Sequence, residues 1–113
     1  MVVDNALDDE VDRIFHALAD ATRRDILARV VRREQSVSAL AEGYAMSFAA
    51  VQKHVAVLEQ ATLIVKEKRG REQIVHGNVE SVQKATRLLQ HVEDVWRDRI
   101  QGISDILSPD EDR

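Results

Sequence analysis

The stretch "MSFAAVQKHVAVLEQATLI", residues 46–64, predicts one short helix, from Phe48 to about Gln60, whose two sides differ in chemistry. Successive residues lie about 100° apart around a helix axis. Three apolar residues then share a stripe that we expect to be buried: Val51, Val55 and Leu58. The opposite side carries small and polar residues: Ala49, Gln52, Lys53 and Ala56.

This polar side has the chemistry of a surface that reads DNA. Its alanines allow close approach, Gln52 can form paired hydrogen bonds with an adenine edge, and Lys53 can reach guanine or phosphate. Ser47 is a good N-cap, and the free N–H groups beside Ser47 and Phe48 favour a phosphate oxygen. An ordinary amphipathic surface helix has the same pattern. The neighbouring elements are therefore needed to distinguish a DNA-reading helix from an ordinary surface helix.

The residues before this helix predict three more helices. Apolar spacing indicates a first helix over about 7–19. Asp20 is expected to cap a second, "ATRRDILARVVRRE", with an apolar face of Ile26, Leu27, Val30 and Val31. After a short extended break at 36–38, Ser38 is expected to cap a brief third helix, "ALAEGYA", ending near 43–45. The third and fourth helices, joined by a tight turn, are typical of a helix-turn-helix.

After this helix, the apolar residues no longer follow helical spacing. The β-branched runs "LIVKEK" and "EQIVH" flank "RGR" and predict a hairpin with Gly70 at its tip. Its basic residues are Lys66, Lys68, Arg69 and Arg71. Asn78 is expected to cap a long helix from 79 to about 101, with a possible interruption at Gly102. A charged hairpin alone is often only a solvated turn, but directly after a helix-turn-helix it is typical of the wing of a winged helix.

The composition of the chain limits its possible size, fold class and location. The chain has 113 residues, 44% hydrophobic but only 4% aromatic, which predicts a single, mostly helical domain over 1–113 with an aliphatic core. No cysteine occurs, and no signal peptide or membrane-length apolar run is evident, so we expect a cytoplasmic protein. The net charge is −4, but the ends, about 1–6 and 107–113, are acidic and expected to be flexible. Residues 13–102 hold 15 basic and 11 acidic residues, a net of +4.

Three segments of the chain resemble the ArsR-type winged-helix transcriptional repressors. They are "LADATRRDIL", the pattern S-x-x-x-V-x-K-H-V-x-x-L beginning at Ser47, and "LI-x-x-x-x-x-GR" in the wing. The resemblance spans about residues 11–96 and implies a homodimeric repressor that binds a double-stranded DNA operator, with its own promoter as a candidate location. The chain departs from the family at Gln52, where a small serine-like residue is usual, and this leaves the preferred base sequence open.

Carried onto matching positions, the resemblance implies a set of DNA-contacting residues: Ser47, Phe48, Ala49, Gln52, Lys53 and His54, with Lys68, Arg69 and Arg71 from the wing. His54 lies at the edge of the apolar stripe. It fits a packed histidine donating one hydrogen bond as well as it fits a phosphate contact.

The predicted last helix has an unusually wide apolar surface. From 82 to 106, alternating steps of three and four give an apolar stripe broken only by Arg99, with another apolar line beside it. Such a wide apolar surface indicates that one side covers a second copy. The expected dimer residues are Leu7, Val11, Phe15, Leu89, Val92, Trp96 and Ile103. The alternative is a monomer whose terminal helix is fully buried.

Other functions find less support in the residues. The four histidines fall on four different predicted elements, so we expect no metal site and no cofactor, although a metal-responsive repressor remains an alternative. Without a cysteine, a glycine-rich phosphate loop or a His–carboxylate cluster, an enzyme is not expected. The cysteine-free pattern is similar to the SdpR-like autorepressors. A winged-helix module that binds protein rather than DNA is the remaining alternative, and the sequence gives no indication of an effector.

Overall fold

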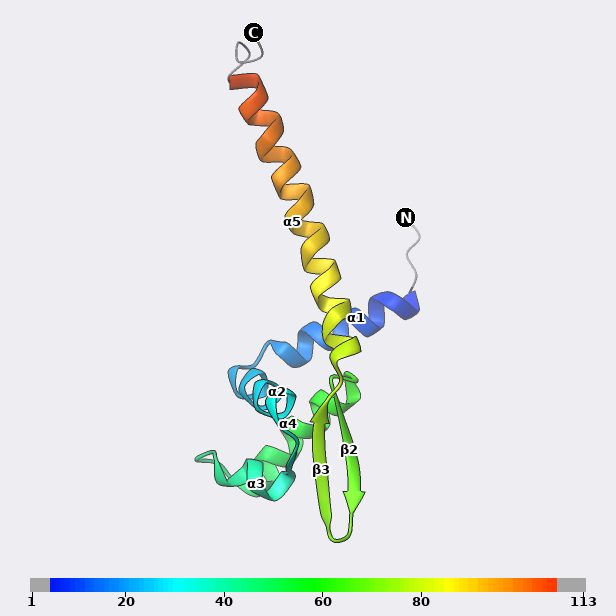
Figure 1. Cartoon of the computed structure of the whole chain (residues 1–113), viewed down its shortest axis with the longest axis vertical. Coiled ribbons are helices and arrows are strands. Elements are labelled where there is room, and N and C mark those ends of the chain that lie inside the picture. Colours follow the sequence, from blue (N-terminus) through cyan, green and yellow to red (C-terminus); the bar gives the residue numbers. More distant parts are fainter. Residues whose placement is uncertain (1–4, 108–113) are drawn as a thin grey trace.

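The structure is a computed structural model that describes residues 5–107, with side chains from residue 9 onward. Its elements, in chain order, are α1 (Asn5–Leu18), α2 (Ala21–Arg32), β1 (Gln35–Ser36), α3 (Val37–Glu42), α4 (Phe48–Gln60), β2 (Ile64–Arg69), β3 (Glu72–Gly77) and α5 (Val79–Leu107). The β2–β3 hairpin points away at one end of the molecule and α5 projects from the other, so the whole measures 70 × 33 × 22 Å (Figure 1). The mostly helical class with a small hairpin is confirmed.

Polar caps begin the short helices. The Asp20 side chain accepts a hydrogen bond from the Arg23 backbone N–H (3.1 Å), and Ser47 Oγ accepts one from Ala50 N–H (3.1 Å), as predicted. The predicted cap of α3 is wrong: Ser36, rather than Ser38, accepts from Ala39 N–H (3.0 Å). Ser36 pairs with β3 in extended conformation, so the chain passes directly from the sheet into the helix.

The sheet has three antiparallel strands in the order β1-β3-β2. Arg69 pairs with Glu72, which leaves Gly70 and Arg71 as the hairpin loop, and Gly70 has a φ of 62° that favours glycine. The hairpin is therefore confirmed. The two-residue strand β1, which pairs Gln35 with Val75, was expected only as an extended break.

The core is aliphatic. Its largest fully buried side chains are Ile14, Ile26, Leu40, Leu58, Leu63, Ile64, Val51, Val55 and Val75. Val31 was expected on the buried face of α2 but is 48% exposed. It lies at the edge of the core over Gly77, where an added Cβ would come within 2.6 Å of Val31 Cγ2. The missing side chain of Gly77 thus allows β3 to approach α2 closely.

The last helix begins at Val79 as predicted, but its far end and the contacts of Asn78 differ from the expectation. It continues through Gly102 to Leu107, because one glycine weakens a helix by about 1 kcal/mol without having to break it. Asn78 directly precedes the helix, but its side-chain amide donates to Thr62 O (2.9 Å) and Ser81 Oγ (3.3 Å), which joins α5 to the turn after α4. Within residues 5–107 no helix is both long and apolar enough to cross a membrane.

The expected dimer residues fall into two groups. On α1, Val11 and Phe15 are half-buried, and Leu7 belongs to the residues whose side chains are not described. On α5, Leu89, Val92, Trp96 and Ile103 are exposed to between 48% and 57%. The ends expected to be flexible lie largely outside the described residues, although α1 already begins at Asn5 and α5 ends only at Leu107.

Candidate nucleic-acid interface

The turn between α3 and α4 is held against α2 by one tyrosine. The Tyr44 hydroxyl donates to Asp25 Oδ2 (2.6 Å), and the Arg29 guanidinium lies over the Tyr44 ring, 4.6 Å from its centroid. Burial, with the hydrogen bond to Asp25, raises the pKa of Tyr44 to about 12. Arg29 also donates to Asp25 Oδ2 (2.9 Å). This cluster fixes where α4 begins. The sequence pattern held no sign of it, because its residues are up to 19 positions apart.

The buried and exposed sides of α4 are those that the sequence predicts. Val51, Val55 and Leu58 are at most 1% exposed and pack into the core. The side chains expected to face DNA at the start and along the outer side of the helix are exposed: Ser47, Phe48, Ala49, Gln52 and Lys53. Phe48 is 47% exposed, which is unusual for so large an apolar side chain. An apolar contact with a thymine methyl group would use it.

His54 lies apart from this exposed side. It is half-buried, and its Nδ1 is 3.3 Å from Arg23 Nη1. Because a guanidinium only donates, His54 Nδ1 accepts this hydrogen bond. Arg23 also donates to Ala17 O (2.7 Å) and to His16 O (3.2 Å) at the end of α1. Of the two alternatives that the sequence left open for His54, this contact fits the packed histidine, with Nδ1 accepting rather than donating.

Two of the four basic side chains of the hairpin are paired with acids. Arg69 contacts Glu34, which lies just before β1, and its Nη2 also donates to Glu67 Oε1 (3.0 Å). The hydrogen bonds that Arg69 donates to Glu34 and Glu67 raise the pKa of Arg69, and the same bond to Glu34 lowers the pKa of Glu34. Lys66 Nζ lies 3.4 Å from Glu59 Oε1.

The remaining two, Lys68 and Arg71, are exposed and form no salt bridge within residues 5–107. The structure thus separates the predicted wing residues into a free pair and a paired Arg69. Free cations are the ones that can neutralise phosphates without first losing a partner.

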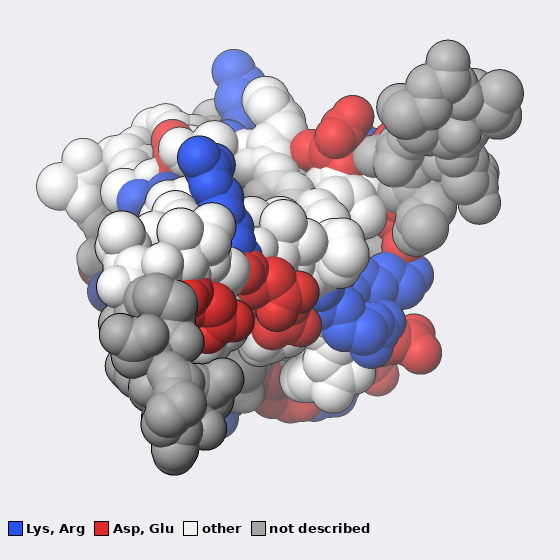
Figure 2. Space-filling view, turned by 90° about the horizontal axis from the view of Figure 1, so that it is seen from above, with Lys and Arg blue, Asp and Glu red and all other residues white. Residues whose placement is uncertain are grey.

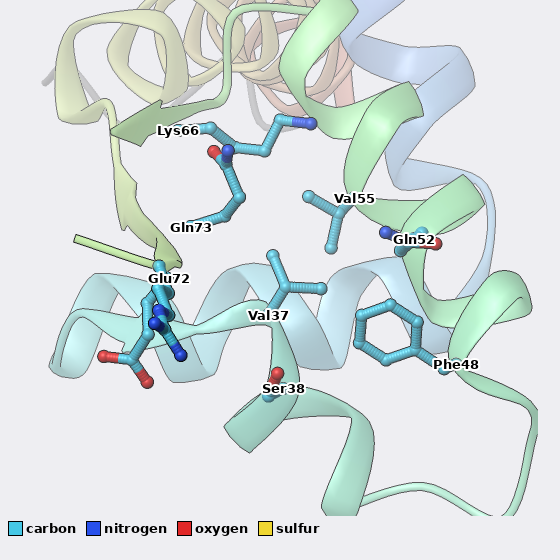
Figure 3. Close-up of a pocket in the computed structure, with 9 residues that line it drawn as sticks. Val37, Ser38, Phe48, Gln52, Val55, Lys66, Glu72 and Gln73 are labelled. Carbon is cyan, nitrogen blue, oxygen red and sulfur yellow. The ribbon is translucent and has the colours of Figure 1, made fainter. Parts of the chain in front are cut away.

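The helix α4, which is the expected recognition helix, and the β2–β3 hairpin face each other across a hollow of about 150 Å³ (Figure 3). Gln52 and Phe48 border it from α4, Lys66 and Gln73 from the strands, and Val37 and Val55 lie between them. Its other lining residues are Ser38, Arg71 and Glu72. Ser38 and Gln73 were not among the predicted site residues, because the packing of α3 and of the hairpin against α4 depends on tertiary structure.

The opposite end of the molecule has a different surface. Figure 2 looks onto the end from which α5 projects, away from the hairpin, and shows large uncharged areas with basic and acidic side chains interspersed. The histidines lie on four separate elements: His16 on α1, His54 on α4, His76 on β3 and His91 on α5.

Comparisons with known proteins agree with this geometry. Residues 18–67, from the end of α1 into β2, match a family model described as a helix-turn-helix domain. No curated protein matches the sequence significantly.

Solved structures give closer matches. An ArsR-like transcriptional regulator from Rhodococcus sp. RHA1 is 33% identical, with a TM-score of 0.75 over 87% of this chain and 92% of that one. An ArsR family transcriptional regulator is 30% identical, with a TM-score of 0.75 over 86% of this chain and 97% of that one.

A third structure, from Mycobacterium bovis, is 25% identical, with a TM-score of 0.66 over 83% of this chain and 91% of that one. It is described as the homodimeric winged helix-turn-helix DNA-binding domain of a possible ArsR-family regulator. In the present chain, α3 and α4 form the helix-turn-helix and the β2–β3 hairpin forms the wing. The chain belongs to the ArsR family of winged helix-turn-helix proteins and is a DNA-binding transcriptional regulator.

Proposed function

We propose that the protein is a homodimeric repressor that binds a near-palindromic operator, with α4 in the major groove and the wing against the adjacent backbone. One observation carries this proposal: Phe48 and Gln52 of α4 line the same hollow as the free cation Arg71 of the hairpin. The second free cation, Lys68, lies on β2 of the same hairpin. Gln52 and Lys53 are assigned to base edges, and Ser47, Phe48 and Ala49 to close contact at the start of the helix.

The homodimer is supported by the exposed apolar residues of α5 and by the description of the M. bovis relative as homodimeric. A two-fold dimer presents its two recognition helices to major grooves about 34 Å apart, which calls for a symmetric operator. We assign the chain to the cysteine-free, SdpR-like branch of the family because it contains no cysteine, and we propose its own promoter as the operator's first candidate location.

Two sets of substitutions test the assigned roles. Gln52→Ala should lose discrimination at one base pair per half-site, roughly a tenfold effect, and leave binding to random DNA unchanged. Lys68→Ala with Arg71→Ala should weaken binding to all sequences alike and flatten the log–log salt slope by about 0.9 for each phosphate that is no longer neutralised. Fluorescence anisotropy on operator and scrambled duplexes measures both.

Gln60→Ala is the matched control, because Gln60 is also an exposed glutamine of α4 but lies at the other end of the helix. It should bind like the wild type. Equal losses on operator and scrambled DNA for Gln52→Ala would refute the reading role of Gln52, and failure of the wild type to distinguish any sequence would refute the operator.

A further inference from the structure

Three polar side chains join the recognition helix, the wing and α5 at a single junction, composed of Thr62, Asn78 and Ser81. Thr62 Oγ1 and Ser81 Oγ are 2.8 Å apart, and Asn78 Nδ2 donates to Thr62 O (2.9 Å) and to Ser81 Oγ (3.3 Å). Ser81 is only 3% exposed, although the surrounding core is aliphatic. A buried polar group in such a core depends on having these partners.

The backbone at the junction is also unusual. Thr62 has a φ of 60°, a left-handed conformation that a β-branched residue rarely adopts. Backbone hydrogen bonds hold the segment on both sides: Leu63 N–H donates to Leu58 O (3.0 Å), and Asn78 N–H donates to Leu63 O (2.8 Å). The end of α4, the start of β2 and the start of α5 are therefore fixed to one another.

Among the residues that the structure describes, only the first turns of α5 are attached to the other elements. Ser81 and Ala85 are buried, Val82 is half-buried, and Lys84 pairs with Glu10 of α1. From Leu88 onward every described α5 side chain is exposed, and Figure 1 shows this part of the helix standing clear of the other elements. At 29 residues the helix is about 43 Å long, so a tilt of about 10° at its base moves its far end by roughly 7 Å.

We propose that Thr62, Asn78 and Ser81 are positioning residues that set the angle between α5 and α4, and with it the separation of the two recognition helices on DNA. This inference rests on the proposed homodimer, in which the far part of α5 contacts the second copy. If the angle between α5 and α4 is fixed, the two α4 helices of the dimer are held at one separation and orientation. Each added base pair shifts and rotates one half-site relative to the other, so the dimer should prefer one half-site spacing.

The test measures spacing preference with the full-length dimer. Duplexes carry two operator half-sites at the preferred spacing or with one base pair inserted or deleted. The wild type should favour the preferred spacing about tenfold or more. Asn78→Ala should bind a single half-site like the wild type but discriminate between the spacings less than about threefold.

Two further variants separate positioning from folding. Thr62→Gly keeps the carbonyl that accepts from Asn78 and adopts a φ of 60° readily, so it should fold well yet still lose part of the spacing preference through its missing hydroxyl. Thr86→Ala is the control: its hydroxyl donates to Val82 O (3.1 Å) within α5 and joins no second element. Its spacing preference should match the wild type, and thermal unfolding shows that each variant is folded.

The outcomes separate this inference from the function on which it rests. A wild type without operator binding or spacing preference would refute the proposed dimeric function itself. A wild type with a sharp preference that Thr62→Gly and Asn78→Ala both retain would refute the positioning role alone. Loss of preference in Thr86→Ala as well would also overturn it, because the effect would not depend on the junction.

Discussion

At the scale of single residues, the charge that a side chain offers to DNA depends on its partners rather than on its type. The sequence has four basic residues in the wing, and the family resemblance assigns three of them, Lys68, Arg69 and Arg71, to DNA without distinguishing among these three. The structure pairs Arg69 with Glu34 and Glu67, and Lys66 with Glu59, while Lys68 and Arg71 remain free in the described chain. Glu34 lies 35 residues before Arg69, so no local pattern could reveal the pairing.

Glu34→Gln is therefore expected to strengthen DNA binding. With Glu34 neutral, a phosphate competes for Arg69 with the Glu67 carboxylate alone rather than with two carboxylates, so affinity should rise a few-fold and the salt slope should steepen by up to about 0.9. Titrations at several salt concentrations measure both quantities. Glu72→Gln is the control, since it removes the same charge from the wing without releasing Arg69. If Glu34→Gln instead weakened binding, Glu34 would be needed to place the wing.

At the scale of elements, the sequence predicted most of what positions the site. The cap at Ser47, the bounds of α4 and the hairpin around Gly70 are confirmed, because strong caps, helical periodicity and turn residues all agree there. The features that the sequence did not predict are those for which neighbouring residues form no clear pattern. A two-residue strand has no period to detect, so β1 and the cap at Ser36 were missed. The contacts of Tyr44 and Asn78 depend on tertiary structure.

The Tyr44 cluster predicts a pH dependence of stability. The Tyr44 hydrogen bond lowers the pKa of Asp25 below its ordinary value. A carboxyl group with a lowered folded pKa contributes stability above its unfolded pKa and loses it as the pH falls through the folded pKa. Tyr44→Phe should therefore lower Tm at neutral pH, and the difference from wild type should narrow as Asp25 becomes protonated.

Thermal unfolding from about pH 7 down to about pH 2 measures this difference. Tyr44→Phe retains the ring beneath Arg29, so only the hydroxyl contact with Asp25 is removed. A Tm difference that stayed constant over the whole range would contradict the linkage to Asp25.

At the scale of the whole molecule, we assign DNA binding to one end and dimerisation to the other. The wing lies at one end and α5 extends from the other (Figure 1), and α5 carries exposed apolar residues. The apolar stripe of α5 was visible in the sequence as alternating steps of three and four, and its exposure in the single chain excludes the monomer with a fully buried terminal helix. The sequence alone could not separate these two cases.

Trp96→Glu is expected to separate the dimer without unfolding the chain. Trp96 is 57% exposed, so the folded monomer loses little. In a two-fold interface the change occurs twice, and the loss of two buried side chains at about 1.5–3 kcal/mol each corresponds to a dimer Kd at least about 100-fold weaker. Sedimentation equilibrium measures the Kd. Gln83→Glu adds the same charge to the same helix and should leave the dimer intact; an unchanged dimer for Trp96→Glu would place the interface elsewhere.

The most direct test of a dimer that reads DNA through α4 is selection of bound sequences from a random duplex pool, with wild type and Gln52→Ala compared. The account predicts that wild type enriches an inverted repeat whose half-site centres lie about 10 base pairs apart. Gln52→Ala should enrich the same repeat with one position in each half-site no longer specified. Enrichment of unpaired sites without symmetry, or the same motif at full strength with Gln52→Ala, would contradict it.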